Sequence, residues 1–179
     1  MRKKEEKMII LDYGKLKRIV EAHKALGHKI VCTIGSWDML HIGHLRYLMK
    51  AKSYGDILVV GADSDRGIKL YKKNNLRPVI PQKERLEMLK YQQCIDYATL
   101  VDDIDKKGNW QYGLVKTIRP DFFVTTDSYT KEQIKKLRLY AGKVLKLTRQ
   151  AGQTSTTEFI EKTVKKHLKF LASTMTAKK

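Results

Sequence analysis

The sequence predicts an α/β fold in which a parallel sheet of five strands is doubly wound, with helices on both of its faces. Segments of strand-like and helix-like composition alternate along the chain, which is typical of consecutive β-α-β units. The predicted strands are apolar throughout instead of alternating apolar and polar residues, as expected for strands covered on both faces. The chain has 179 residues, of which 42% are hydrophobic, enough for one domain with a substantial core.

Each element follows from a local pattern. A helix at about 14–26 is predicted by the helical spacing of Leu16, Val20 and their apolar neighbours, and Gly27 ends it. Five short apolar runs are the predicted strands, at 29–35, 56–63, 97–102, 121–126 and 143–148. The remaining predicted helices run from the two histidines of the segment 41–44 to Gly55, then over 82–91, 110–119, 130–141 and 155–172.

Two parts of the chain break this alternation. Residues 64–81 are expected to be irregular, because their polar and apolar residues follow neither a helical nor a strand period. We expect a single domain over 1–172, since no linker-like stretch divides it, followed by a disordered basic tail over 173–179.

The chain is strongly basic: 37 Lys and Arg against 19 Asp and Glu give a formal net charge of +18. Such a charge attracts polyanions, which include nucleotides, phosphorylated metabolites and nucleic acids. No apolar run is long enough to span a membrane, the N-terminus has no secretory pattern, and the two cysteines lack metal-binding spacing. We therefore expect a cytoplasmic protein with reduced thiols.

The stretch IGSWDMLHIGHLRYL, residues 34–48, places His41 and His44 at the junction between a predicted strand and a predicted helix. Residues three apart share one face of a helix, and the free N–H groups of a helix N-terminus bind phosphates. Gly35 ends the strand and allows the backbone to approach a ligand closely. The pair is thus placed to donate to one phosphoryl group. Core histidines and half of a metal site are the alternatives, although a metal would need further clustered ligands.

Three motifs resemble those of a known enzyme family. GSWDMLHIGH resembles the (T/N)-x-G-x-F-D-x-x-H-x-G-H signature of the cytidylyltransferase-like nucleotidyltransferases, which include glycerol-3-phosphate cytidylyltransferase, and TSTTEFIEK resembles their I-S-T-T-x-x-I motif. NNLRPVIPQKERLEML resembles a segment of the adenylyltransferase domain of bacterial ADP-heptose synthase. The resemblance implies a Rossmann-like sheet and transfer of a nucleoside monophosphate from ATP or CTP to a phosphorylated small molecule, with release of pyrophosphate.

The resemblance also implies roles for residues at the matching positions. The expected catalytic residues are His41, His44 and Lys69, with Lys72 and Lys73 as alternatives for the lysine. The expected nucleotide-binding residues are Thr33, Ile34, Gly35, Ser36, Asp127, Ser155, Thr156 and Thr157. The expected acceptor-binding residues are Asp38, Arg77 and Arg85. Mg²⁺ or another divalent cation is expected to share the phosphate charge, without an assigned protein ligand.

The sequence does not identify the acceptor molecule or the base of the nucleotide. The candidate acceptors are a sugar 1-phosphate such as a heptose phosphate, glycerol 3-phosphate, another alcohol phosphate and flavin mononucleotide. A homodimer is expected from the resemblance. The alternative function is a relative that has lost catalysis and binds nucleic acid through its basic surface, although the dispersed Lys and Arg residues disfavour it.

Overall fold

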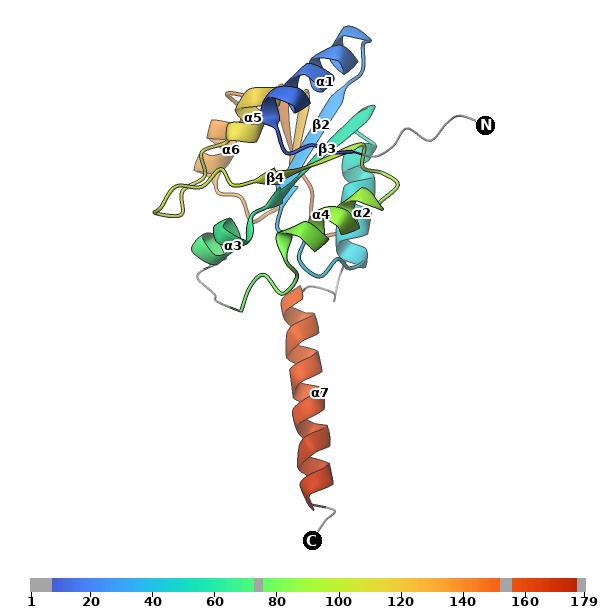
Figure 1. The fold of residues 1–179 in the computed structure, drawn as a ribbon, viewed down its shortest axis with the longest axis vertical. Helices are drawn as coiled ribbons and strands as arrows, with labels where there is room; N and C mark the ends of the chain where they lie inside the picture. The colour runs from blue at the N-terminus through green and yellow to red at the C-terminus, as the bar shows by residue number, and fades with distance from the viewer. Residues whose placement is uncertain (1–7, 73–75, 152–155, 177–179) are drawn as a thin grey trace, which may run out of the picture.

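The computed structural model describes residues 8–72, 76–151 and 156–176, and its centre is a parallel sheet (Figure 1). The five predicted strands are all present, and a two-residue strand joins them at one edge. In spatial order the strands are β1 (Met8–Ile9), β4 (Tyr97–Val101), β3 (Ile57–Asp63), β2 (Ile30–Gly35), β5 (Phe122–Thr125) and β6 (Lys143–Lys146).

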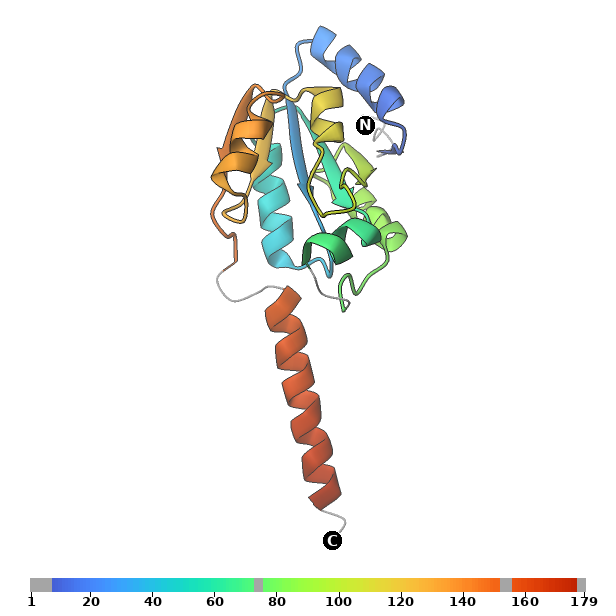
Figure 2. The ribbon, with the colours of Figure 1, turned by 90° about the vertical axis from the view of Figure 1, so that its left-hand side faces the viewer.

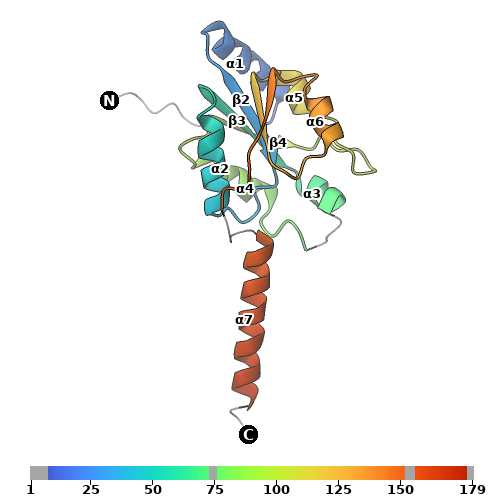
Figure 3. The same cartoon turned by 180° about the vertical axis from the view of Figure 1, so that it is seen from behind.

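Helices cover both faces of the sheet, as the apolar strands predict (Figures 1 and 3). The helices are α1 (Tyr13–Ala25), α2 (Ile42–Lys52), α3 (Asp65–Lys72), α4 (Gln82–Lys90), α5 (Gly113–Ile118), α6 (Lys131–Leu137) and α7 (Thr156–Thr176). Side chains of α1, α5 and α6 pack with Ile30 and Cys32 of β2, whereas side chains of α2 and α4 pack with Val31. Alternate residues of one strand therefore enter two separate hydrophobic cores.

The order of the strands places a switch point between β2 and β5. From β2 the chain winds outward through β3 to β4, and it then returns to the other side of β2 to form β5 and β6. Ligands of doubly wound sheets bind at such a point, beyond the carboxyl ends of the strands. Gly35 and Thr125 end the two strands there.

The prediction that 64–81 is irregular is wrong for its first half, where α3 forms. The hydroxyl of Ser64 accepts a hydrogen bond from the backbone N–H of Gly67 at 2.9 Å, which caps the first turn. Ile68 is the one large apolar side chain of α3 that is fully buried. A helix held by one such residue shows no apolar period in the sequence, which explains the difference.

Helix α7 projects away from the sheet instead of packing on it (Figure 2). Its predicted apolar side is largely in solvent: Val164, Leu168 and Leu171 are 50%, 60% and 43% exposed. The helix continues to Thr176, beyond the expected start of a tail at 173, and residues 177–179 lie outside the described residues. No helix among the described residues combines the length and apolar character that a membrane span requires.

Candidate active site

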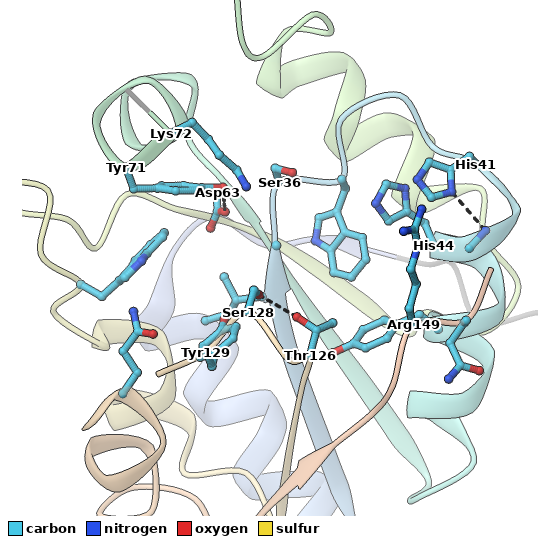
Figure 4. Close-up of a pocket in the computed structure, with 18 of the residues that line it drawn as sticks. Ser36, His41, His44, Asp63, Tyr71, Lys72, Thr126, Ser128, Tyr129 and Arg149 are labelled. Atoms are coloured by element: carbon cyan, nitrogen blue, oxygen red, sulfur yellow. Dashed lines mark hydrogen bonds between the residues drawn. The ribbon is translucent and has the colours of Figure 1, made fainter. Parts of the chain in front are cut away.

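A cavity of about 600 Å³ opens at the switch point of the sheet (Figure 4). It lies where β2, β3 and β5 end, which is the position that the topology predicts for a ligand. Among the residues that line it are Ile34, Gly35, Ser36, Trp37, His41, Gly43, His44, Asp63, Tyr71, Lys72, Trp110, Thr126, Ser128, Tyr129, Arg149 and Ala151.

His41 is the N-cap of α2, a position where side-chain acceptors are favoured. Its Nδ1 accepts a hydrogen bond from the backbone N–H of Gly43 at 3.1 Å. Since a neutral imidazole has one donor and one acceptor nitrogen, this bond places the proton of His41 on Nε2. A Cβ at position 43 would lie 2.9 Å from the His41 ring and 3.1 Å from Ala151, so the glycine between the histidines is required by space.

His44 stacks on His41, with ring centroids 3.9 Å apart, and meets the edge of Trp37. Burial lowers the pKa of His44 to about 4, and the neighbouring His41 adds to the effect. Burial also lowers the pKa of His41, and the Arg149 guanidinium acts in the same direction. Both rings are therefore neutral at pH 7. They can donate hydrogen bonds to phosphates, but they do not supply positive charge.

Among the described residues that line the cavity, Lys72 and Arg149 carry the positive charges. Lys69, the predicted catalytic lysine, is exposed and does not line the cavity, whereas Lys72, one turn later in α3, does. Lys73, the other alternative, lies outside the described residues. Arg149 forms an ion pair of 2.7 Å with Glu158 of α7, which connects the start of that helix to the cavity wall.

Two of the predicted acceptor-binding residues lie behind the cavity wall. Asp38 is fully buried and accepts hydrogen bonds from Arg77 Nε at 2.6 Å and from the backbone N–H groups of Val79 and Ile80 at 3.1 and 3.0 Å. The side chain of Arg77 is 12% exposed. Neither residue lines the cavity. Their ion pair holds the segment before α4 against the turn between β2 and α2.

Arg85, the third predicted acceptor-binding residue, is also fully buried. Its guanidinium donates to the carbonyls of Ser36, of Asp63 at 2.7 Å and of Ile80 at 2.9 Å, and to the carboxylate of Asp65 at 2.7 Å. It fastens the ends of β2 and β3 and is a positioning residue. The sequence does not distinguish a buried arginine of this kind from an arginine that binds a ligand, because the local sequence pattern is the same in both cases.

The predicted nucleotide-binding residues of the first motif divide into two groups. Ile34, Gly35 and Ser36 line the cavity, as the resemblance implies. Thr33 does not, since it is fully buried and its hydroxyl bonds to the Tyr47 hydroxyl at 2.9 Å. Ile34, Gly35 and Ser36 lie at and just beyond the end of β2, whereas Thr33 lies within the covered part of the strand.

Asp127 is also displaced from the cavity. It is exposed and forms an ion pair of 2.7 Å with Lys146. Its neighbours Thr126 and Ser128 line the cavity instead, and their hydroxyls bond to each other at 2.7 Å.

The second motif meets the first through Thr156. The Thr156 hydroxyl is buried and donates to the Asp38 carbonyl at 2.8 Å, across 118 positions of sequence. This bond brings the start of α7 to the turn that carries the histidines. Ser155 and the side chain of Thr157 lie outside the described residues.

Sequence reasoning missed a third group at the end of β3 and along α3. Asp63 is 2% exposed and lines the cavity. Its Oδ2 accepts a hydrogen bond from the Tyr71 hydroxyl at 2.9 Å, and burial raises its pKa to about 7. Trp110 lines the cavity beside Tyr71, with ring centroids 5.4 Å apart. The available signal was a carboxylate that ends an otherwise apolar strand.

One protein-family model matches most of the chain. Residues 32–171 match the family model described as cytidylyltransferase-like. The chain belongs to the cytidylyltransferase-like family. This confirms the family that the three motifs indicated, and the matched range contains both histidines and the start of α7.

Two relatives of the cytidylyltransferase-like domain are proteins named "Bifunctional protein HldE". The one from Geobacter metallireducens is 40% identical over 147 residues, and the one from Geobacter sulfurreducens is 38% identical over 150 residues. These alignments cover 80% and 82% of this chain but 29% of each relative, so the chain spans less than a third of their length.

A solved structure supports the fold. The "lipopolysaccharide core biosynthesis protein" from Thermoplasma volcanium matches with a TM-score of 0.58 and 24% sequence identity. The match covers 69% of this chain and 98% of that one. It confirms the predicted Rossmann-like α/β sheet.

Proposed function

We propose that this cytidylyltransferase-like domain transfers a nucleoside monophosphate from ATP or CTP to a phosphorylated small molecule, releasing pyrophosphate. The observation that carries the proposal is the stacked pair of neutral imidazoles, His41 and His44, at the N-terminus of α2 in the cavity wall. The HldE relatives and the likeness to the adenylyltransferase domain of ADP-heptose synthase support a sugar phosphate as the acceptor.

The proposed reaction needs positioning and charge stabilisation more than proton transfer. A phosphate oxygen of the acceptor forms a bond to the α-phosphorus of the nucleotide, and the bond from that phosphorus to the bridging oxygen of pyrophosphate breaks. The attacking oxygen is already anionic, so no strong general base is required. As negative charge moves onto the leaving pyrophosphate, the imidazole N–H groups donate to it, and Arg149, at the same end of the cavity, offsets the added charge.

A divalent cation fits this proposal as a companion of the nucleotide. Mg²⁺ is usually held by one or two carboxylates together with substrate phosphates and water. Asp63, the one carboxylate among the cavity-lining residues that the structure describes, lies at the end away from the histidines, and no group of three or more ligating side chains occurs in the described part of the chain, so no protein ligand is assigned to the ion. The phosphates would supply most ligands, and the ion would supply further charge stabilisation.

The test is a pyrophosphate-release screen of ATP and CTP against sugar 1-phosphates, glycerol 3-phosphate and flavin mononucleotide. Wild-type protein should release pyrophosphate with one acceptor class, and His44→Ala should lower kcat by about 10²–10³-fold, as expected for loss of a transition-state donor. His167→Ala, which removes an exposed histidine of α7, is the matched control and should keep the wild-type rate. Equal rates for wild type and His44→Ala would contradict the proposed role.

A further inference from the structure

Asp63 carries a buried oxygen that the described structure leaves without a partner. Its Oδ2 accepts the Tyr71 hydroxyl, whereas no described residue donates to Oδ1, although the side chain is almost fully buried. An unpaired buried oxygen of this kind costs about 1–3 kcal/mol, more if it is charged. Because Asp63 lines the cavity, a ligand can reach this oxygen and supply the missing hydrogen bond.

The surroundings of this oxygen fit a neutral donor. Arg85 donates to the backbone carbonyl of Asp63, so its hydrogen bonds do not satisfy Oδ1. Lys72 lines the same cavity, which disfavours a second cation beside it. Tyr71 and Trp110 present aromatic rings that can cover an apolar C–H surface. A hydroxyl group on a carbon skeleton, beside a phosphate for the lysine, satisfies all three.

The position in the cavity assigns this end to the acceptor. In Figure 4, Asp63, Tyr71 and Lys72 lie at one end of the cavity and His41, His44 and Arg149 at the other, with Ser36 between them. In the proposed function the histidine end holds the nucleotide phosphates. The carbon skeleton of the acceptor then occupies the opposite end.

We propose that Asp63 determines acceptor specificity, with its free carboxylate oxygen accepting a hydrogen bond from a hydroxyl of a polyol or sugar phosphate. This inference rests on the proposed function for the orientation of the two substrates. Acceptors that lack the hydroxyl are rejected, because they leave Oδ1 unpaired. Tyr71 is a positioning residue that orients the carboxylate through Oδ2.

The experiment pairs a change in the protein with a change in the ligand. Binding is measured by titration calorimetry and saturation-transfer NMR on the full chain, with mannose 1-phosphate, glycerol 3-phosphate and propyl phosphate, which lacks the hydroxyls, as probes. At pH 8, above the pKa of about 7 that burial gives Asp63, wild type should bind at least one hydroxylated probe about 10–100-fold more tightly than propyl phosphate, the range expected for a hydrogen bond to a charged group. Asp63→Asn keeps the shape and one acceptor oxygen, and should reduce this preference to about threefold or less.

Two further variants separate specificity from folding. Tyr71→Phe keeps both carboxylate oxygens and should retain part of the preference. Glu132→Gln changes an exposed carboxylate of α6 and should retain all of it. Where turnover is measurable, Asp63→Asn should raise the KM of the hydroxylated acceptor and leave the KM of the nucleotide unchanged.

Each outcome decides the inference. A preference for hydroxylated probes that persists in Asp63→Asn overturns it, and so does wild-type protein that binds no hydroxylated probe better than propyl phosphate. A preference that depends on Asp63, found together with no pyrophosphate release on any acceptor, supports the role of Asp63 and rejects the proposed reaction.

Discussion

Replacing Arg85 with Met tests whether this arginine is a positioning residue or a ligand for the acceptor phosphate. Arg85→Met keeps a long apolar stem but removes every donor, which leaves three carbonyls and the Asp65 carboxylate without their partner. The Ser36 carbonyl belongs to a cavity-lining residue, and the side chain of Asp65 is 33% exposed, so water can replace the lost bonds there.

The expected loss of stability follows from the two hydrogen-bond acceptors that water reaches least readily. The carbonyls of Asp63 and Ile80 lose a buried donor, at about 1–3 kcal/mol each. Together the two carbonyls account for a loss of about 2–6 kcal/mol. We therefore expect the free energy of unfolding to fall by about 4 kcal/mol, a large part of the ~5–15 kcal/mol of a typical domain.

Urea unfolding followed by tryptophan fluorescence measures this loss, with Arg85→Lys as the comparator. The ammonium retains the charge and up to three donors, so Arg85→Lys should lose less stability than Arg85→Met. If Arg85→Met unfolds at the wild-type urea midpoint and only the KM for the acceptor rises, the guanidinium binds the acceptor and the reasoning from burial is refuted.

Three further predictions concern the histidine motif and the lysine. The pKa of His44 is about 4 in the folded protein and ordinarily 6.5, so the unfolded state binds an extra proton as the pH falls. The free energy of unfolding should therefore fall by about 2 kcal/mol between pH 7 and pH 5. Urea unfolding of His44→Gln should lack this loss, and an equal dependence on pH in the variant would contradict the lowered pKa. Gly43→Ala places a methyl group 2.9 Å from the His41 ring. Because this displaces the ring, kcat should drop about 10-fold or more while the circular-dichroism spectrum stays unchanged. Wild-type activity in this variant would show that the ring can move without loss of function. Lys72→Met should lower kcat/KM for the acceptor by about 10–100-fold and Lys69→Met should lower it by less than about twofold. A larger loss in Lys69→Met would restore Lys69 as the lysine of the site.

The local parts of the site could be predicted from the sequence. His41, Gly43 and His44 interact within one helical turn, so their spacing alone indicates that both rings lie near a helix N-terminus. The burial of β2 and β3 likewise follows from runs of apolar residues, because a strand covered on both faces has no polar side. The family followed from the same motifs.

The roles of the charged residues could not be predicted in this way. Arg85 reaches the carbonyl of Ser36 across 49 positions, and Asp38 meets Arg77 across 39. Whether such a group faces the cavity or the protein interior depends on how distant segments pack, and this is not encoded near the residue itself. The same holds for Lys69 and Lys72. Both belong to α3, and only the packing of this helix against the cavity decides which of the two lines it.

The sequence by itself determined five of the strands, most of the helices and the histidine pair, because these depend on backbone hydrogen bonding and on side-chain periods of a few residues. Only the tertiary structure decided which basic side chains face the cavity and which form hydrogen bonds inside the protein. It also revealed that one oxygen of the Asp63 carboxylate accepts a hydrogen bond while the other has no described partner. The physical reason is that burial and hydrogen-bond partners are properties of contacts between segments, and a charged residue has the same letter in either environment.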